Sequence, residues 1–209
     1  MMEYRQPLAM LALIFLAGMS ALTSCSGDTE EYDPYENWQV RNAAWFEQKA
    51  DSARENKDGQ WLMLKSLDMS PTFQSGKTAD SICVHIIKHG TGTVTPYYTD
   101  SIRVNFRGWL MPTINAQGKQ EELTFTQTYY GDFDPATAAP QLATVKAFTS
   151  GFATALQYMV VGDDWIVYIP QELFYGSSAS GVIPAYSAAR FRIQLAAIYP
   201  TGSLVPDWK

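Results

Sequence analysis

Few residues in this sequence are candidates for catalysis or metal binding, and their spacing does not match a known reactive site. His85 and His89 are four positions apart, which on a strand separates them by about 13 Å, too far to bind one metal ion unaided. The serine-rich run 176–181 contains no Gly-x-Ser-x-Gly elbow. Asp132 and Asp134 lack the further oxygen ligands of a calcium loop. We therefore expect no metal site, no cofactor and no nucleophile, and interpret these segments as strand ends, a flexible loop and a solvated turn.

Aromatic and branched apolar side chains, in contrast, are frequent at the predicted ends of strands and helices. They are Phe106, Phe125, Phe148, Phe152, Tyr175, Val182, Ile183 and Phe191. Any one of them is ordinarily a core residue. Their order along the chain and the motifs around them must therefore decide whether they form more than a core.

Composition limits the class of protein. The chain has 209 residues, 46% of them hydrophobic, and a formal net charge of -6. This length fits one globular domain with additional segments. A surface that follows nucleic-acid phosphates needs clustered Lys and Arg, so the acidic balance argues against nucleic acid as a partner.

The N-terminus has the pattern of an export signal. Arg5 precedes an apolar run at positions 8–22, which suits a secretory signal and is shorter than the roughly 20 residues of a membrane-spanning helix. The run ends in LTSC at positions 22–25, which resembles the lipobox of bacterial lipoproteins, whose Cys is diacylated and becomes the first residue. We expect residues 1–24 to be a lipoprotein signal peptide. The alternative is a secreted protein in which Cys25 is incidental.

Lipidation at Cys25 would anchor the protein in the cell envelope. Each buried methylene contributes about 0.8 kcal/mol of membrane affinity, so two acyl chains anchor durably. The expected location is the outer membrane, with the protein facing the periplasm or the cell surface. Cys83, the other of the two cysteines, then has no intramolecular disulfide partner.

A tether and a helix are expected after the anchor. Residues 25–35 are acidic and aperiodic, which is typical of a disordered tether. Residues 36–56 predict a helix with an aromatic stripe of Trp38, Trp45 and Phe46 on one face. The stripe could pack on the domain behind it or pair with a second copy of the chain as a homodimer. Single aromatic stripes usually belong to a core, which favours packing.

The remaining periodicity predicts strands and one short helix. Strands are expected at 61–67, 82–87, 101–110, 123–128, 165–169 and 188–198. The third of these alternates with period two and turns Phe106 toward its buried face. Ser150 is expected to cap a helix that Gly162 ends, with an apolar face formed by Phe152, Ala155, Leu156 and Met159.

This order of elements predicts an α+β fold. No strand-helix-strand unit repeats, so we expect an antiparallel sheet curled around one short helix and preceded by an N-terminal helix. Residues 36–80 would form the N-terminal helix and strand extension, 81–200 the main domain and 201–209 a C-terminal tail.

Between residues 82 and 200 the order of short motifs resembles that of an FKBP-type peptidyl-prolyl cis-trans isomerase domain. The matching segments are HGTG at 89–92, VNFRGWL at 104–110, FTQT at 125–128, GF at 151–152, VGD at 161–163, IP at 169–170, FYG at 174–176, VIP at 182–184 and Phe191. Each motif is weak alone, but their common order over more than half of the chain is specific. The resemblance implies an FKBP-like fold and an isomerase that assists the folding of exported proteins. Its partners would be proline-containing polypeptides, and it would need no cofactor.

The resemblance also implies the site residues. It places Tyr175, Phe106, Phe125, Phe152 and Phe191 in catalysis, and Thr126, Phe148, Thr149, Val182 and Ile183 in substrate binding. The Tyr175 hydroxyl and the Ile183 backbone N–H are the implied hydrogen-bond donors. Amide rotation has a barrier of about 18–20 kcal/mol, and the planar ground state is the more dipolar one. An apolar pocket therefore favours the twisted state without a nucleophile or a metal.

Three positions depart from the family pattern. Phe106 stands where the family usually has Tyr, Thr126 where it has Asp, and Phe152 where Trp commonly forms the pocket floor. The segment between 110 and 125 is longer than in compact members, and the rim at 129–140 is expected to be rebuilt. Two functions stay open: an isomerase of weak activity, or an FKBP-like lipoprotein that binds peptides or proteins without turnover.

Overall fold

The computed structural model describes residues 32–68 and 76–208. The predicted signal peptide, Cys25 and most of the acidic tether lie outside these residues and stay predictions. The described fold belongs to the compact unit that begins at Pro34. Across these two ranges, none of the helices combines the length and the apolar character needed to cross a membrane.

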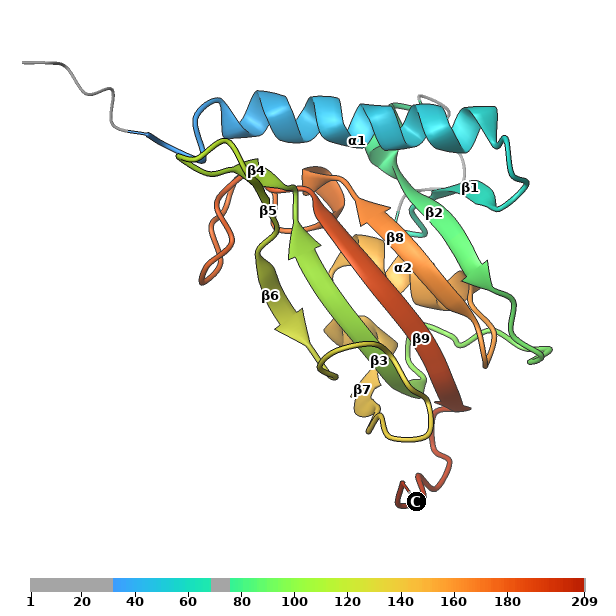
Figure 1. Ribbon diagram of the computed structural model, residues 1–209. Helices are drawn as coiled ribbons and strands as arrows, with labels where there is room; N and C mark the ends of the chain where they lie inside the picture. Colours follow the sequence, from blue (N-terminus) through green and yellow to red (C-terminus); the bar gives the residue numbers. More distant parts are fainter. Residues whose placement is uncertain (1–31, 69–75, 209) are drawn as a thin grey trace, which may run out of the picture. The chain divides into compact units, whose positions relative to one another are not determined.

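An antiparallel sheet forms the centre of the described fold (Figure 1). Its strands are β1 (Trp61–Lys65), β2 (Ser81–Lys88), β3 (Ser101–Leu110), β6 (Thr124–Gln127), β7 (Gln141–Thr144), β8 (Asp164–Ile169) and β9 (Ala189–Tyr199). The strand order is β1-β2-β8-β9-β3-β6, and β7 also pairs with β3. A separate hairpin joins β4 (Thr113–Ile114) to β5 (Gln120–Glu121). The predicted α+β fold with an antiparallel sheet is confirmed; the sequence pattern missed β4, β5 and β7.

The short helix α2 (Ser150–Tyr158) lies behind the sheet in Figure 1 and packs against the strands. Its predicted apolar face is fully buried: Phe152 is 2% exposed, and Ala155, Leu156 and Met159 are 0% exposed. They contact alternate residues of the strands, among them the predicted inward-facing Phe106. This periodicity places the Phe106 and Phe152 rings in the same cluster.

Both predicted ends of α2 were wrong, by one residue at the start and by three at the end. The N-cap is Thr149, whose side chain makes no capping hydrogen bond, and Ser150 is the first helical residue. The Ser150 hydroxyl instead donates a hydrogen bond to the Asp68 carboxylate, which takes it away from the helix end. At the other end the chain turns to an extended conformation at Met159, before Gly162 is reached.

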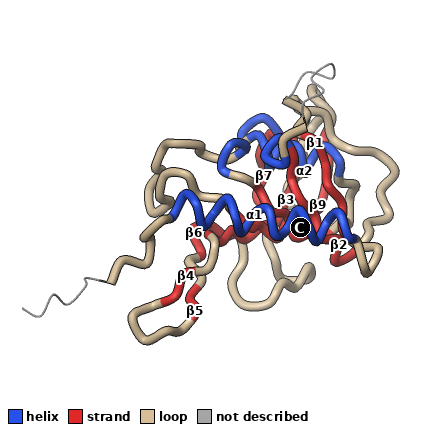
Figure 2. The backbone as a smooth tube through the Cα atoms, turned by 90° about the horizontal axis from the view of Figure 1, so that it is seen from above, coloured by secondary structure: helices blue, strands red, loops and turns tan. Residues whose placement is uncertain are grey.

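Helix α1 (Trp38–Glu55) packs on the face of the sheet opposite α2. Along β2, Ile82 and Val84 contact the α2 core, whereas Cys83 between them packs against Phe46 and its neighbours on α1. Figure 2 shows α1 running across the strands. This is the packing arrangement that the sequence favoured, and a homodimer through α1 would have to use its solvent-facing side.

Two side chains of α1 fasten it to the segment that enters β9. The Trp38 indole Nε1–H donates to Ser187 Oγ at 2.9 Å, and the Ala188 N–H donates to Asn42 Oδ1 at 2.8 Å. Trp38 also belongs to a buried cluster with Leu110 and Ile183. α1 therefore packs against the segment around Ile183.

Candidate active site

One cavity of about 380 Å³, which we call the aromatic cavity, collects the residues that the family resemblance implied. All ten line it: Phe106, Phe125, Thr126, Phe148, Thr149, Phe152, Tyr175, Val182, Ile183 and Phe191. They come from β3, β6, the entry to α2, the loop after β8, and β9. The fold therefore brings the implied residues to one place, while their individual roles stay predictions.

Aromatic rings form a connected network around the cavity. Phe152 lies at its centre, stacked on Phe148 with ring centroids 4.5 Å apart and edge-to-face against Phe191 at 4.9 Å. Phe106 meets Phe152 edge-to-face at 5.5 Å, and Phe125 meets Phe191 at 5.4 Å. Edge-to-face pairs hold each ring in one orientation. The cavity wall is therefore apolar and preformed.

The sequence interpretation missed Phe174 as a cavity residue. Phe174 lines the cavity and lies 5.7 Å from Phe125 and 4.4 Å from Tyr175, centroid to centroid. It ends the short 3-10 helix Gln171–Leu173 that follows β8. Its place directly before the Tyr-Gly pair was the only signal in the sequence.

The exposed fractions of the lining residues distinguish a buried floor of the cavity from a rim that is open to solvent. Phe106, Phe152, Phe191 and Ile183 are all less than 8% exposed, whereas Tyr175 is 41% exposed. A ligand group would thus enter past Tyr175 and rest on buried rings.

Gly108 on β3 leaves space for the rings of Phe125 and Phe191. A Cβ at this position would lie 2.6 Å from Phe191 Cε1 and 2.8 Å from Phe125 Cζ, closer than side chains pack. Gly108 pairs with Thr126 on β6 and with Phe191 on β9. The absence of a side chain on β3 therefore makes room for the cavity wall on both neighbouring strands.

The Ile183 N–H, an implied donor to the substrate, is already engaged within the chain. The Ile183 N–H donates to the Ser180 carbonyl at 3.0 Å, and the Ser180 N–H donates back to Ile183 at 2.9 Å. Gly181 at the tip has φ of +58°, which a tight two-residue hairpin requires at its first central position. Residues 180–183 form a tight turn at the end of the serine-rich run, and the hydrogen bond that closes this turn engages the Ile183 N–H.

The cavity is polar only at a few neutral groups. Among the described residues, its lining includes the side chains of Thr126, Thr149, Tyr175 and Ser180 and no charged side chain. Such a lining suits a neutral apolar ligand group held by one or two hydrogen bonds. Its described lining residues contain hydroxyl groups but no carboxylate, imidazole, amine or thiol that could act as an acid, a base or a nucleophile.

The loop at 129–140 is not the cavity rim that the sequence suggested. Arg107 donates to the carbonyls of Tyr129 and Gly131, each at 3.2 Å, and its guanidinium lies 5.1 Å from the Tyr129 ring centroid. Arg107 points away from the face that carries Phe106, because neighbours along a strand face opposite sides. The loop is thus held on the other side of the sheet.

The other candidate chemistries stay apart in the fold. His85 contacts Asp58 at 3.0 Å and lies against the Trp61 ring, while His89 is exposed beyond the end of β2. Within the described ranges, no group of three or more His, Cys, Asp or Glu side chains is placed to hold a metal ion. Asp134 accepts a hydrogen bond from the Ala136 N–H, as in a solvated turn.

Sheet, helix and cavity together define an α+β protein that is shaped to bind a neutral apolar group. The model of the FKBP-type peptidyl-prolyl cis-trans isomerase family matches residues 92–196, half of the chain, and the chain belongs to this family. The matched range contains every residue that lines the cavity.

Two characterised proteins are similar in sequence. The FKBP-type 22 kDa peptidyl-prolyl cis-trans isomerase of Escherichia coli (strain K12) is 30% identical over 119 residues, which are 56% of this chain and 50% of that protein. The chain thus matches about half the length of this relative. The macrophage infectivity potentiator of Trypanosoma cruzi is 24% identical over 194 residues, 92% of this chain and 82% of that protein.

Two solved structures share the fold. A peptidyl-prolyl cis-trans isomerase from Pseudomonas syringae pv. tomato aligns with a TM-score of 0.53 at 21% identity, over 80% of this chain and 98% of that one. FkpA from Escherichia coli aligns with a TM-score of 0.53 at 21% identity, over 79% of this chain and 62% of that one. At this identity the likeness concerns the fold alone.

Proposed function

We propose that the protein is a peptidyl-prolyl cis-trans isomerase that assists the folding of exported proteins. The observation that carries the proposal is that Phe106, Phe125, Phe152 and Phe191 all line one cavity of about 380 Å³. A cavity of this size and composition can enclose a proline ring. Its substrate would be an Xaa-Pro segment of an unfolded or partly folded polypeptide.

The cavity would lower the rotation barrier by its environment. Planar amides are more dipolar than twisted ones, so transfer from water onto aromatic rings disfavours the planar ground state of the Xaa-Pro bond. The ring network holds the proline while the preceding carbonyl rotates. No bond is made or broken in this step, so the reaction needs no cofactor.

Two donors could hold the substrate carbonyls. Tyr175 lines the cavity and is 41% exposed, and its hydroxyl is the first of these donors. Because the Ile183 N–H is occupied, the Thr149 N–H takes its place in our proposal. Thr149 caps α2 and lines the cavity, and a helix leaves its first N–H groups without intrahelical acceptors.

Exchange spectroscopy on an Xaa-Pro peptide tests the proposal directly. The cis and trans forms of a short Ala-Leu-Pro-Phe-type peptide give separate NMR signals, and we expect micromolar protein to accelerate their exchange. A proline-limited refolding reaction should accelerate in parallel. Exchange at the uncatalysed rate in the presence of folded protein would refute isomerase activity.

The second candidate function is peptide binding without turnover. Two observations favour it: Thr126 replaces a carboxylate that the family pattern has, and the Ile183 N–H is closed by Ser180. It requires that the same peptide broadens or shifts the signals of cavity residues while its exchange rate stays unchanged. A peptide that neither binds nor exchanges would exclude both functions.

We further propose that the protein is anchored through a lipid on Cys25 in the cell envelope, at the outer membrane. The support is the order of Arg5, the apolar run at 8–22 and the LTSC sequence that ends in Cys25. Metabolic labelling with a radioactive fatty acid should mark the wild-type protein and leave Cys25→Ala unmarked. Equal labelling of both proteins would remove Cys25 as the acylation site.

A further inference from the structure

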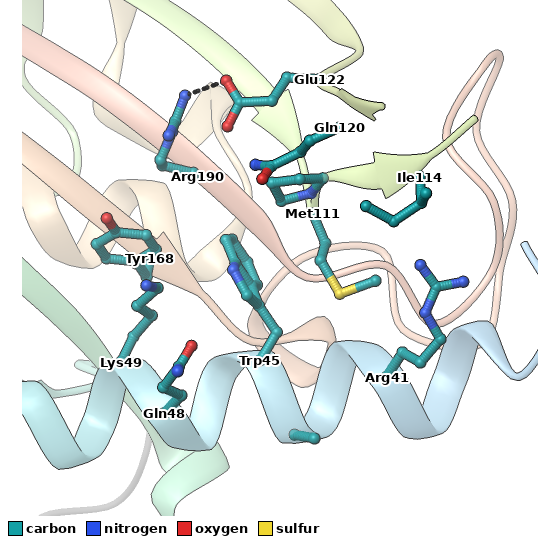
Figure 3. Close-up of a pocket in the computed structure, with 12 residues that line it drawn as sticks. Arg41, Trp45, Gln48, Lys49, Met111, Ile114, Gln120, Glu122, Tyr168 and Arg190 are labelled. Atoms are coloured by element: carbon teal, nitrogen blue, oxygen red, sulfur yellow. Dashed lines mark hydrogen bonds and ion pairs between the residues drawn. The ribbon is translucent and has the colours of Figure 1, made fainter. Parts of the chain in front are cut away.

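A second and larger cavity lies beside α1, the helix on the other face of the sheet from α2, and Figure 3 shows its lining residues. It has a volume of about 690 Å³ and lies between α1 and the β4-β5 hairpin. Arg41, Trp45 and Lys49 of α1 form one wall, and Tyr168 of β8 and Arg190 of β9 belong to the sheet side. None of its lining residues lines the aromatic cavity. We call it the α1 groove.

The α1 groove is positively charged in a protein whose formal net charge is -6. Its charged side chains are Arg41, Lys49, Arg190 and Glu122. Glu122 pairs with Arg190 at 2.8 Å, which neutralises that arginine. Of the ion pairs in the described part of the chain, none includes Arg41 or Lys49. Two cations therefore face the groove without a carboxylate.

Neighbouring groups hold in place these two cations, which form no ion pair with a carboxylate. Arg41 Nη1 donates to the carbonyls of Pro34 and Glu36 at 3.0 and 3.1 Å, which fixes the guanidinium at the start of α1. Lys49 Nζ lies 5.5 Å from the centroid of the Tyr168 ring. Both positions leave charge available to a ligand in the groove.

An apolar surface separates the two cations. Trp45 lies between them along α1 and meets Tyr168 edge-to-face at 5.6 Å. Figure 3 shows the Trp45 ring next to Met111, with Ile114 on the opposite wall. Ile114 is 48% exposed, so it presents an apolar surface without being part of a core. A ligand here meets positive, apolar and positive surfaces in turn.

The spacing of the cations matches an extended peptide. Eight residues along a helix separate Arg41 from Lys49 by about 12 Å, and an extended chain covers that distance in about four residues. We propose that the α1 groove binds an extended acidic polypeptide segment with two carboxylates near Arg41 and Lys49. An apolar side chain between the carboxylates would rest on Trp45 and Ile114. A compact anion could reach only one of the two cations.

Fluorescence anisotropy with a labelled Glu-Ser-Phe-Ser-Glu peptide tests this site. The peptide has the required spacing and contains no proline, so its binding is independent of isomerase activity. We expect binding at low salt that weakens at high salt, because screening shortens the reach of exposed charges. Lys49→Glu should weaken binding about tenfold, since it replaces an attraction by a repulsion. The peptide with Lys in place of both Glu should not bind.

Matched variants separate the groove from general charge effects. Lys57→Glu changes the net charge equally, and Lys57 is an exposed residue outside the groove that pairs with Glu55. We expect it to leave the affinity within twofold of wild type. Ile114→Ser should weaken binding severalfold by removing an apolar wall. Equal affinity of wild type and Lys49→Glu would overturn the proposal.

Two further outcomes identify another occupant or another site. Backbone NMR signals of α1 and the β4-β5 hairpin should shift on peptide addition, and shifts confined to the aromatic cavity would overturn the assignment. If a second copy of the chain occupies the groove, light scattering would show a dimer that Lys49→Glu dissociates and the peptide would not bind. That result would also overturn the peptide proposal.

Discussion

The indole Nε1–H of Trp38 donates a hydrogen bond to Ser187 Oγ over 2.9 Å and 149 sequence positions. The Ser187 hydroxyl in turn donates to the Pro184 carbonyl at 2.6 Å. Pro184 directly follows Ile183 in the cavity wall, and Trp38 and Ile183 share one buried cluster. The N-terminal helix is therefore joined to the cavity wall by a short chain of buried contacts.

Replacing the Trp38 indole should destabilise the contact between α1 and the cavity wall. Trp38→Phe removes a buried hydrogen bond and part of an apolar contact, and we expect the free energy of unfolding to fall by about 1–3 kcal/mol. Urea unfolding at neutral pH measures the change. Val40→Ala is the matched control on α1, because Val40 is 70% exposed, and it should change stability by less than about 0.5 kcal/mol. Equal midpoints for Trp38→Phe and wild type would contradict a structural role for the bond.

A methyl group at Gly108 should damage the aromatic cavity. The Cβ of Gly108→Ala would lie 2.6 Å from the Phe191 ring and 2.8 Å from the Phe125 ring, so both rings must move. Overpacking of this kind costs about 1–3 kcal/mol, and we expect proline-peptide affinity to drop about tenfold or more. Gly76→Ala is the control, since a Cβ there meets nothing within 4 Å. An unchanged affinity in Gly108→Ala would show that the rings do not bind the peptide.

The Tyr175 hydroxyl can be tested without disturbing its ring. Because Tyr175 is 41% exposed, Tyr175→Phe should leave stability unchanged. Loss of one neutral hydrogen bond, worth about 1 kcal/mol, should slow peptide exchange about fivefold. Tyr130→Phe removes a hydroxyl from a side chain that is 84% exposed and lies outside the cavity. Equal exchange rates in the two variants would remove Tyr175 from the site.

Thr126 offers a gain-of-function experiment. Thr126→Asp places a carboxylate at the cavity, where the family pattern has one, and a charged acceptor binds a donor more strongly than a hydroxyl does. We expect peptide exchange to accelerate about threefold to tenfold, equivalent to about 0.7–1.4 kcal/mol of transition-state stabilisation. Thr126→Val, which removes polarity at similar volume, should not accelerate it. If the Asp variant is no faster than the Val variant, the carboxylate is not what limits activity.

Much of the site could be predicted because its residues carry motifs with local causes. Phe106 alternates with other buried residues of β3, and Phe152 lies on a helix face with period 3.6, so each direction follows from local geometry. The order of motifs then indicated that these faces meet at one cavity. The position of each ring relative to the others is a tertiary property, which is why Phe174 was missed.

Most of what the sequence did not predict depends on contacts between distant segments, and the pairing of Ile183 depends on the geometry of one turn. The loop 129–140 follows Phe125 closely in sequence, but Arg107 holds it on the opposite face of the sheet. The Ile183 N–H was expected to be free, and its pairing with Ser180 depends on how tightly Gly181 turns. The α1 groove is assembled from α1, β8, β9 and a hairpin too short to show a periodic pattern.

Cys83 should make the protein less stable in alkaline solution. Burial raises the pKa of its thiol from 9.0 to about 12, with the charge of Glu47 adding to the effect and that of Arg54 opposing it. Cys83 is 0% exposed and packs beneath α1. Below pH 9 the thiol is protonated in both the folded and the unfolded state and does not affect the balance. Between pH 9 and about 12 only the unfolded state releases the proton, so stability falls as the pH rises.

Comparison with Cys83→Ala isolates this contribution. Burial also raises the pKa of Tyr168, which contacts the same cluster, so wild type and variant should share that part of the alkaline loss. From pH 8 to about 10.5, the thiol should cost wild type roughly 2 kcal/mol more than the variant, at about 1.4 kcal/mol per pH unit above pH 9. Urea midpoints at the two pH values measure the difference. The same loss in both proteins would mean that the buried thiol ionises in the folded state as readily as in the unfolded chain.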